Sequence, residues 1–143
     1  MAATDTIHVD IVSAEGEIYS GPAKMVFLPA SEGEIGVTPR HAPLLSLLKA
    51  GEVRVLPADG GPEQYFFVGG GALEVQPKKV TVLADTAARA HDLDEAAAIE
   101  ARKRAEEALA GKIDKLEQAE ALAELARAAA QLKLIERLRK IKG

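Results

Sequence analysis

The chain is organised around residues 31–45, which read SEGEIGVTPRHAPLL and lie in the middle of a strand-rich half. Gly33 and Gly36 give the backbone freedom to turn sharply, and Pro39 and Pro43 fix two further bends. Polar side chains lie between these turn residues, and the apolar run LLSLL begins directly after them. The combination predicts a loop that presents a contact surface on a rigid scaffold, although an ordinary hairpin connection has a similar composition.

Length and composition limit the possible classes of protein. The 143 residues suffice for one medium domain or two small ones, and a chain of this size folds without disulfides or metals. There is no Cys, which excludes thiol catalysis and Cys-ligated zinc. With three Phe, two Tyr and no Trp, the core must be aliphatic.

Charge and hydropathy exclude two further classes. The net charge of −4 does not favour binding to nucleic acid. No apolar run approaches the roughly 18 residues that span a bilayer, and the N-terminal sequence MAATDT lacks the features of a signal peptide. We therefore expect a soluble cytoplasmic chain or the soluble part of a larger assembly.

Composition changes abruptly near residue 90. All seven Pro lie in the first 77 residues, whereas Ala, Glu, Lys, Arg and Leu dominate after residue 87. This predicts an α+β protein with a β domain at residues 1–90 and a helical domain at residues 91–143.

The first domain reads as eight or more short strands separated by turn signals. Their close spacing predicts a β-sandwich or flattened barrel with mainly antiparallel pairing. The expected strands are 7–12, 17–20, 24–28, 34–37, 52–56, 64–68, 72–75 and 79–83.

The second domain reads as an antiparallel hairpin of two helices, at residues 93–110 and 116–142. Asp92 and Glu95 have the spacing of a capping box, and Gly111 ends the first helix. An alanine-rich seam should join the helices, and because it buries little area per residue the hairpin can detach and repack. The expected seam is Ala97, Ala98, Ala101, Ala105, Ala108 and Leu109 against Leu125, Ala128, Leu132, Ile135 and Leu138.

The end of the second helix is strongly basic. Residues 133–142 contain one acidic residue, Glu136, and five basic residues, which are Lys133, Arg137, Arg139, Lys140 and Lys142. Cations at a helix C-terminus stabilise it through the helix dipole, which is one explanation. The other explanation is an acidic protein partner.

No catalytic or metal-binding constellation stands out. The three His (8, 41 and 91) are scattered, and Gly69–Gly71 leads into a strand rather than a helix, so it reads as a bulge and not as a phosphate loop. We therefore expect a non-enzymatic chain without a cofactor or metal.

Several motifs together resemble the epsilon subunit of bacterial F-type ATP synthases. They are residues 12–15 (VSAE), 31–36 (SEGEIG), 40–45 (RHAPLL), 70–77 (GGALEVQP), 80–87 (VTVLADTA) and 92–96 (DLDEA). The resemblance covers nearly the whole chain. It implies a sandwich of about ten strands that binds the gamma subunit and the c-ring, with an interface at Ser31, Glu32, Gly33, Glu34, His41 and Pro43.

The resemblance also implies a regulatory role for the hairpin. Extended along gamma, its basic end would meet the beta subunits of the alpha–beta head and block ATP hydrolysis. Some members bind ATP through Ile/Leu-Asp-x-x-Arg-Ala and arginines of the second helix. Here residues 93–98 (LDEAAA) include the Asp of that pattern, Asp94, but Ala97 replaces the Arg. On the second helix Arg127 fits one expected position, whereas Glu120 and Gln131 occupy two others. Weak or absent ATP binding is therefore expected.

The resemblance places the chain on the cytoplasmic side of the bacterial inner membrane, peripheral and held through the complex. Two alternatives stay open at this point. One is a free-standing nucleotide sensor with the same fold, and the other is a generic scaffold whose two domains bind separate proteins.

Overall fold

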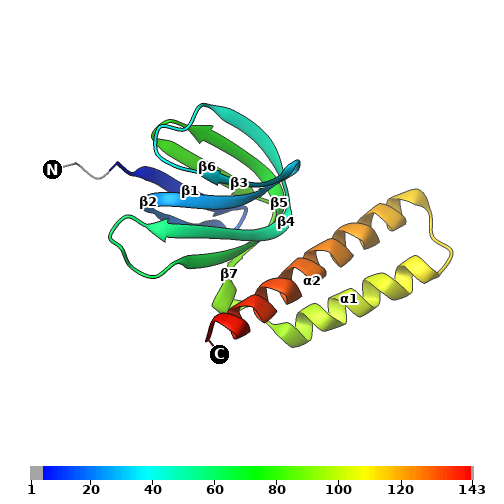
Figure 1. Ribbon diagram of the computed structural model, residues 1–143. Coiled ribbons are helices and arrows are strands. Elements are labelled where there is room, and N and C mark those ends of the chain that lie inside the picture. The colour runs from blue at the N-terminus through cyan, green and yellow to red at the C-terminus, as the bar shows by residue number, and fades with distance from the viewer. Residues whose placement is uncertain (1–4, 143) are drawn as a thin grey trace. The chain divides into compact units, whose positions relative to one another are not determined.

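The computed structural model describes residues 5–142 and divides into two compact units that meet at the Arg89–Ala90 bond. The first unit is a β domain and the second a helical hairpin (Figure 1). Among the described residues, none of the helices combines the length and the apolar character needed to cross a membrane.

Seven strands build the β unit within the described residues. Three of them are long, with 13 to 15 residues each. The strands are β1 (Ile7–Ser13), β2 (Gly16–Ala30), β3 (Gly33–Val37), β4 (Leu44–Pro57), β5 (Gln64–Gln76), β6 (Lys79–Ala84) and β7 (Ala87–Arg89).

The strands form one sheet in the order β1-β6-β5-β4-β2-β3, and β1 also pairs with β2. This extra pairing closes the sheet into a flattened barrel, with β7 paired to β5. All pairs are antiparallel except β1 with β6, which run parallel. The α+β class with mainly antiparallel pairing is thus confirmed in outline.

The expected number of about ten strands is wrong, because long strands continue through residues that looked like breaks. Pro22 lies inside β2 and faces His8 of β1, and Gly69–Gly71 lies inside β5. Gly70 and Gly71 have φ of +103° and +130°, so the strand bends there without ending. A Cβ at Gly71 would collide with the carbonyl oxygen of Leu83, as expected for a tight backbone contact.

The core of the β unit is aliphatic, as expected. Alternating residues of β1 are buried, and the same alternation in parts of β4 and β6 and in the second half of β5 directs Val and Leu side chains inward. In the first half of β5 three consecutive residues, Phe66–Val68, are buried. The largest fully buried side chains of this unit are Phe66, Phe67, Ile7, Ile11, Leu28 and Leu73.

The hairpin consists of a 3-10 turn, Ala90–Asp92, and two helices, α1 (Glu95–Ala110) and α2 (Lys115–Lys142). The predicted capping box at Asp92 is wrong, because Asp92 lies in the 3-10 turn. Asp94 caps α1 instead: its backbone is extended, and its carboxylate accepts from the Ala97 amide at 3.2 Å. Gly111 ends α1 as predicted, with an extended backbone.

A reciprocal cap that was not predicted lies at the start of α2. The Asp114 carboxylate accepts from the Glu117 amide at 2.7 Å, and Glu117 accepts from the Asp114 amide at 3.5 Å. The two possible boxes, at 92–95 and 114–117, have the same Asp-x-x-Glu spacing, so only the path of the chain distinguishes them.

The seam between the helices is alanine-rich but narrower than predicted. Ala98, Ala105, Ala121 and Ala128 are buried, whereas Ala97 and Ala108 are exposed. Leucines and isoleucine of the expected α2 stripe are half-buried. On α1, Ala101 and Leu109 are half-buried beside the fully buried Ala98 and Ala105, so the covered strip is narrow and Ala97 and Ala108 at its border face solvent.

Candidate interaction surfaces

The first predicted surface begins at the turn between β2 and β3. Ala30 pairs with Gly33, which leaves Ser31 and Glu32 as an exposed two-residue turn. The Ser31 amide donates to the Leu47 carbonyl at 2.8 Å, and Gly33 has φ of +136°. The turn is therefore held on the sheet while its side chains point to solvent.

The second part of this surface follows β3 and contains His41 and Pro43. Arg40, a non-glycine residue with φ of +67°, donates its amide to the Pro77 carbonyl at 2.8 Å and pairs with Asp5 at 2.6 Å. The Nδ1 atom of His41 lies 2.6 Å from the Ala42 carbonyl, to which it donates. Pro43 is exposed.

The six predicted interface residues lie on two connections and on the strand between them. Ser31 and Glu32 precede β3, whereas His41 and Pro43 follow it. Between the two groups the chain runs through the five residues of β3. The predicted loop is thus two short connections joined by a strand that carries Glu34.

An exposed apolar patch continues from the second connection and was only partly anticipated. Leu45, Leu47 and Leu83, here called the outer leucine patch, are 77%, 68% and 55% exposed. Leu47 and Leu83 both pair with Ala72, so they lie across β5 from one another. Contiguous exposed leucines on a rigid sheet are typical of a protein interface. The run LLSLL indicated the first two, but Leu83 required knowledge of the register.

The basic end of α2 is divided between two faces. Lys133, Arg137 and Lys140 are spaced 4 and 3 residues apart, so they share one exposed face, here called the basic face. Arg139 lies on another face, and its Nη2 is 2.7 Å from Glu95 Oε1 at the start of α1. Hydrogen bonding to Glu95 raises the pKa of Arg139 above its ordinary value. The side chain of Lys142 lies outside the described residues.

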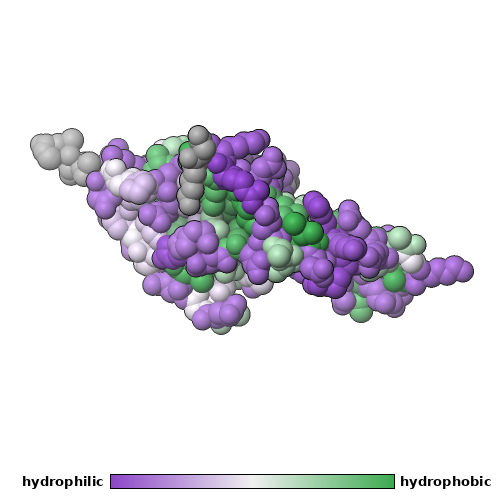
Figure 2. Space-filling view, turned by 90° about the horizontal axis from the view of Figure 1, so that it is seen from below, coloured by the Kyte–Doolittle hydropathy of each residue, from purple (hydrophilic) through white to green (hydrophobic). Residues whose placement is uncertain are grey.

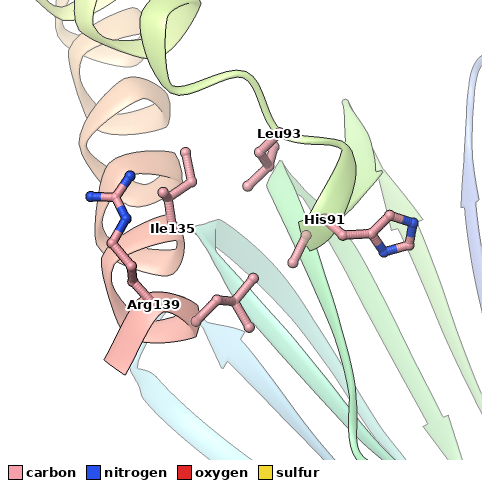
Figure 3. Close-up of a pocket in the computed structure, with 6 residues that line it drawn as sticks. His91, Leu93, Ile135 and Arg139 are labelled. Atoms are coloured by element: carbon pink, nitrogen blue, oxygen red, sulfur yellow. The ribbon is translucent and has the colours of Figure 1, made fainter. Parts of the chain in front are cut away.

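A small cavity of about 210 Å³ lies at the open end of the hairpin, beside this ion pair. Figure 3 shows Leu93 and Ile135 on opposite sides of it, while the imidazole of His91 and the guanidinium of Arg139 point outward. Ala90 and Leu138 complete the lining. The open end is therefore incompletely packed, and the Glu95–Arg139 pair is a direct polar link between the two helices there.

The two residues of the predicted ATP pattern do not converge in the folded hairpin. Asp94 is occupied as the cap of α1. Arg139 lies beside Glu95 at the start of α1, and Arg127 precedes Arg139 by 12 residues on α2, which is roughly 18 Å along the helix at 1.5 Å per residue. Arg127 is therefore far from Asp94, which directly precedes Glu95.

A polar cluster on β1, β2 and β6 has residue types associated with catalysis but not the required geometry. Nε2 of His8 faces both Asp10 Oδ1 at 2.9 Å and Ser20 Oγ at 3.0 Å. A Ser-His-Asp triad uses two different ring nitrogens for these contacts. The Ser20 hydrogen bond at 2.6 Å holds the pKa of Asp10 below its ordinary value, helped by Lys79 and His8 and opposed by burial. Across residues 5–142, no three potential metal ligands gather.

Hydrophobic side chains also remain exposed on the hairpin. Figure 2 shows green residues scattered among purple ones along the helices. Among the described residues of the hairpin, the large hydrophobic residues with exposed side chains are Ile99, Leu116, Leu122 and Ile141.

Comparison with known families defines the class of protein. Residues 6–90 match the family "ATP synthase, Delta/Epsilon chain, beta-sandwich domain", and residues 91–136 match "ATP synthase, Delta/Epsilon chain, long alpha-helix domain". The chain therefore belongs to the ATP synthase delta/epsilon family.

Individual relatives identify the member more closely. The chain is 63% identical over 135 residues to an ATP synthase epsilon chain of Alkalilimnicola ehrlichii, covering 94% of this chain and 96% of that one. It is 61% identical to an ATP synthase epsilon chain of Nitrosococcus oceani, covering 96% and 98%. The resemblance to the bacterial epsilon subunit is confirmed.

Solved structures share the fold at low identity. A chain of the Euglena gracilis mitochondrial ATP synthase (OSCP/F1/c-ring) matches with a TM-score of 0.69 at 18% identity, covering 97% of this chain and 82% of that one. A chain of the Tetrahymena thermophila mitochondrial ATP synthase central stalk/c-ring matches with a TM-score of 0.60 at 11% identity, covering 90% and 96%. These likenesses support the fold.

Proposed function

We propose that this chain is the non-catalytic epsilon subunit in the rotor of a proton-translocating ATP synthase. The observation that carries the proposal is the near full-length match to relatives named ATP synthase epsilon chain. Family membership favours this role over a free-standing nucleotide sensor or a generic scaffold. The subunit would lie on the cytoplasmic side of the bacterial inner membrane, attached through the complex.

In this proposal the β unit is the rotor-binding domain. The outer leucine patch supplies an apolar surface suited to packing on gamma, because exposed leucines on a rigid sheet lose water when they are covered. The β2–β3 turn, Glu34 and the His41–Pro43 connection supply polar contacts to gamma and the c-ring.

The hairpin is the regulatory domain in this proposal. Its alanine seam buries little apolar area, so opening requires less work than opening a leucine-packed pair. Once extended, its basic face would meet acidic residues of the beta subunits in the alpha–beta head and oppose ATP hydrolysis. Asp94 and Arg127 do not converge in the folded state, which supports weak or absent ATP binding.

Deletion of residues 116–143 tests the regulatory half of the proposal. Because the β unit's core is built from residues of that unit, the truncated chain should fold and assemble normally. ATP hydrolysis by the reconstituted complex should rise, and proton-coupled ATP synthesis should persist. A control chain with Arg102 and Lys103 changed to Ala should behave like the unaltered protein. Equal hydrolysis rates with and without the deletion in every nucleotide condition would show that the hairpin does not inhibit ATP hydrolysis.

Crosslinking tests the rotor-binding half. The chain has no Cys, so a Cys introduced at Glu34 is unique. We expect its crosslinks to capture gamma or a c-ring loop, whereas a Cys at Glu107 on the hairpin should give a different set. Capture of alpha or beta alone from position 34 would contradict this orientation.

A further inference from the structure

Arg54 lies at the centre of an outer face of the β unit that β3, β2, β4 and β5 form side by side. Its guanidinium carbon is 4.1 Å from the centroid of the Phe27 ring, and the two residues are cross-strand partners. The Arg54 side chain is only 16% exposed. The sheet below and the strands beside it therefore hold the guanidinium in place.

Three carboxylates surround this guanidinium. Glu52 approaches Nε at 3.1 Å, Glu63 approaches Nη1 at 3.6 Å and Glu34 approaches Nη2 at 3.6 Å. Glu52 and Glu63 are 15% and 28% exposed, and Tyr65 donates a 2.6 Å hydrogen bond to Glu63. Glu34 is 55% exposed, so it is the carboxylate of the three that an approaching protein meets first.

The packing below Arg54 depends on a glycine in β3. A Cβ at Gly36 would lie 2.7 Å from Met25 Cε and 3.2 Å from Phe27 Cε1. The end of the Met25 side chain could move away from such a Cβ, whereas the contact with the Phe27 ring is tighter than most Cβ contacts, so Gly36 lets β3 pack closely beside the ring on which Arg54 rests. Gly36 and Glu34 belong to the same short strand, which ties the position of the guanidinium to that of the carboxylate.

We propose that Arg54 is a positioning residue that orients Glu34 for contact with the rotor. This inference rests on the proposed function, in which Glu34 faces gamma or the c-ring. One guanidinium among three carboxylates leaves a net charge of −2 at the cluster, so Glu34 retains the capacity to accept from a cationic or hydrogen-bond-donating side chain of the partner. Preorganising this carboxylate reduces the rotamer entropy lost on binding.

A double-mutant cycle tests the inference. The variants are Arg54→Met, Glu34→Gln and the pair together, with Lys79→Met as a control that removes an ion pair elsewhere on the β unit. The dissociation constant is measured for purified full-length chain binding to ATP synthase stripped of this subunit, and urea unfolding is followed in parallel. Arg54→Met should weaken binding by about two- to tenfold with Glu34 present and by nothing further in the Glu34→Gln background.

The outcomes separate the inference from the function on which it rests. If the unaltered chain does not bind the stripped complex, the proposed function fails. If that chain binds but Arg54→Met weakens binding equally in both backgrounds, Arg54 does not act through Glu34 and the inference is overturned. If Arg54→Met does not fold, Arg54→Lys is used in the same cycle, because it keeps the charge but loses the planar fork that faces Glu34; the same coupling with Glu34 is then required.

Discussion

The two units of the molecule are stabilised by cores of different kinds. The β unit buries Phe66, Ile7, Ile11, Leu28 and Leu73 with less than 2% exposure. Among the side chains of the hairpin helices that the structure describes, those of four alanines and one leucine are buried, namely Ala98, Ala105, Ala121, Ala128 and Leu134. A fully buried Leu, Ile or Phe contributes about 1.5–3 kcal/mol, and an alanine methyl contributes far less.

This difference in core packing indicates which unit can change conformation. The closed sheet pairs all of its long strands with neighbours, so opening it would expose many backbone groups at once. Each helix of the hairpin satisfies its own backbone hydrogen bonds, and the seam between the helices buries little apolar surface. A helix pair of this kind belongs to the low-stability end of a structure, where switching elements are found.

The largest expected effect is a cavity in the β core. Phe66→Ala should lower the free energy of unfolding by about 3–5 kcal/mol, because a large ring is removed from a site that cannot collapse. Leu122→Ala on the hairpin, where the side chain is 50% exposed, should change it by no more than about 0.5 kcal/mol. Urea unfolding followed by circular dichroism measures both. Equal losses would mean that the two units do not differ in their dependence on packing.

The next effect concerns the basic face of α2. Changing Lys133, Arg137 and Lys140 together to Ala should raise ATP hydrolysis by the assembled complex about fivefold or more, because the extended hairpin loses its contacts with the head. Helicity should not fall, since the positions are exposed and Ala is the best helix former. Loss of helicity with unchanged hydrolysis would show that these cations only stabilise the helix end.

The Glu95–Arg139 pair should have a smaller effect of the opposite sign. Glu95→Gln removes the partner of Arg139 at the open end of the hairpin, so the extended state gains population and hydrolysis falls, by less than about fivefold. Amide hydrogen exchange in the last turns of α2 should become faster. Glu136→Gln, which breaks the neighbouring Lys140 pair within one helix, is the matched control. Identical amide hydrogen exchange in the two variants would show that the Glu95–Arg139 pair does not hold the hairpin closed.

The smallest effect is a pH dependence confined to the β unit. The pKa of Asp10 is lowered in the folded state, chiefly by Ser20, so this carboxylate stabilises the fold above its unfolded pKa of about 3.8. That stability is lost as the pH falls through the lower, folded value. Ser20→Ala should cost about 0.5 kcal/mol at pH 7, because the hydrogen bond is exposed, and less at pH 3. Urea midpoints at the two pH values measure the difference, and a cost independent of pH would contradict the assignment.

Several features of both units were predictable from local sequence. The change of composition near residue 90 divided strands from helices, and Gly111 marked the end of α1, because both are properties of the chain over a few residues. The alternation of apolar residues indicated which side chains of β1 enter the core. Residues 31–45 indicated exposed turns, and the expected strand at 34–37 corresponds to β3.

Other features depended on which segments meet. Asp92–Glu95 and Asp114–Glu117 have the same capping spacing, yet only the second forms a reciprocal box. The five basic residues at the end of α2 looked equivalent until the fold turned Arg139 toward Glu95. The sequence around Arg54 indicated at most its neighbour Glu52 in the same strand, since the other two carboxylates come from residues 34 and 63.

The sequence by itself determined the β-then-helical order, the aliphatic core, the weak alanine seam and the family. Those depend on composition, periodicity and motifs that neighbouring residues carry. The tertiary structure alone decided the closure of the sheet, the place of Leu83 in the outer leucine patch, the contacts of Arg54 with Glu34 and Glu63, and the pairing of Arg139 with Glu95. Each of these requires a register or a contact between residues far apart in the chain, and no local pattern specifies such a contact.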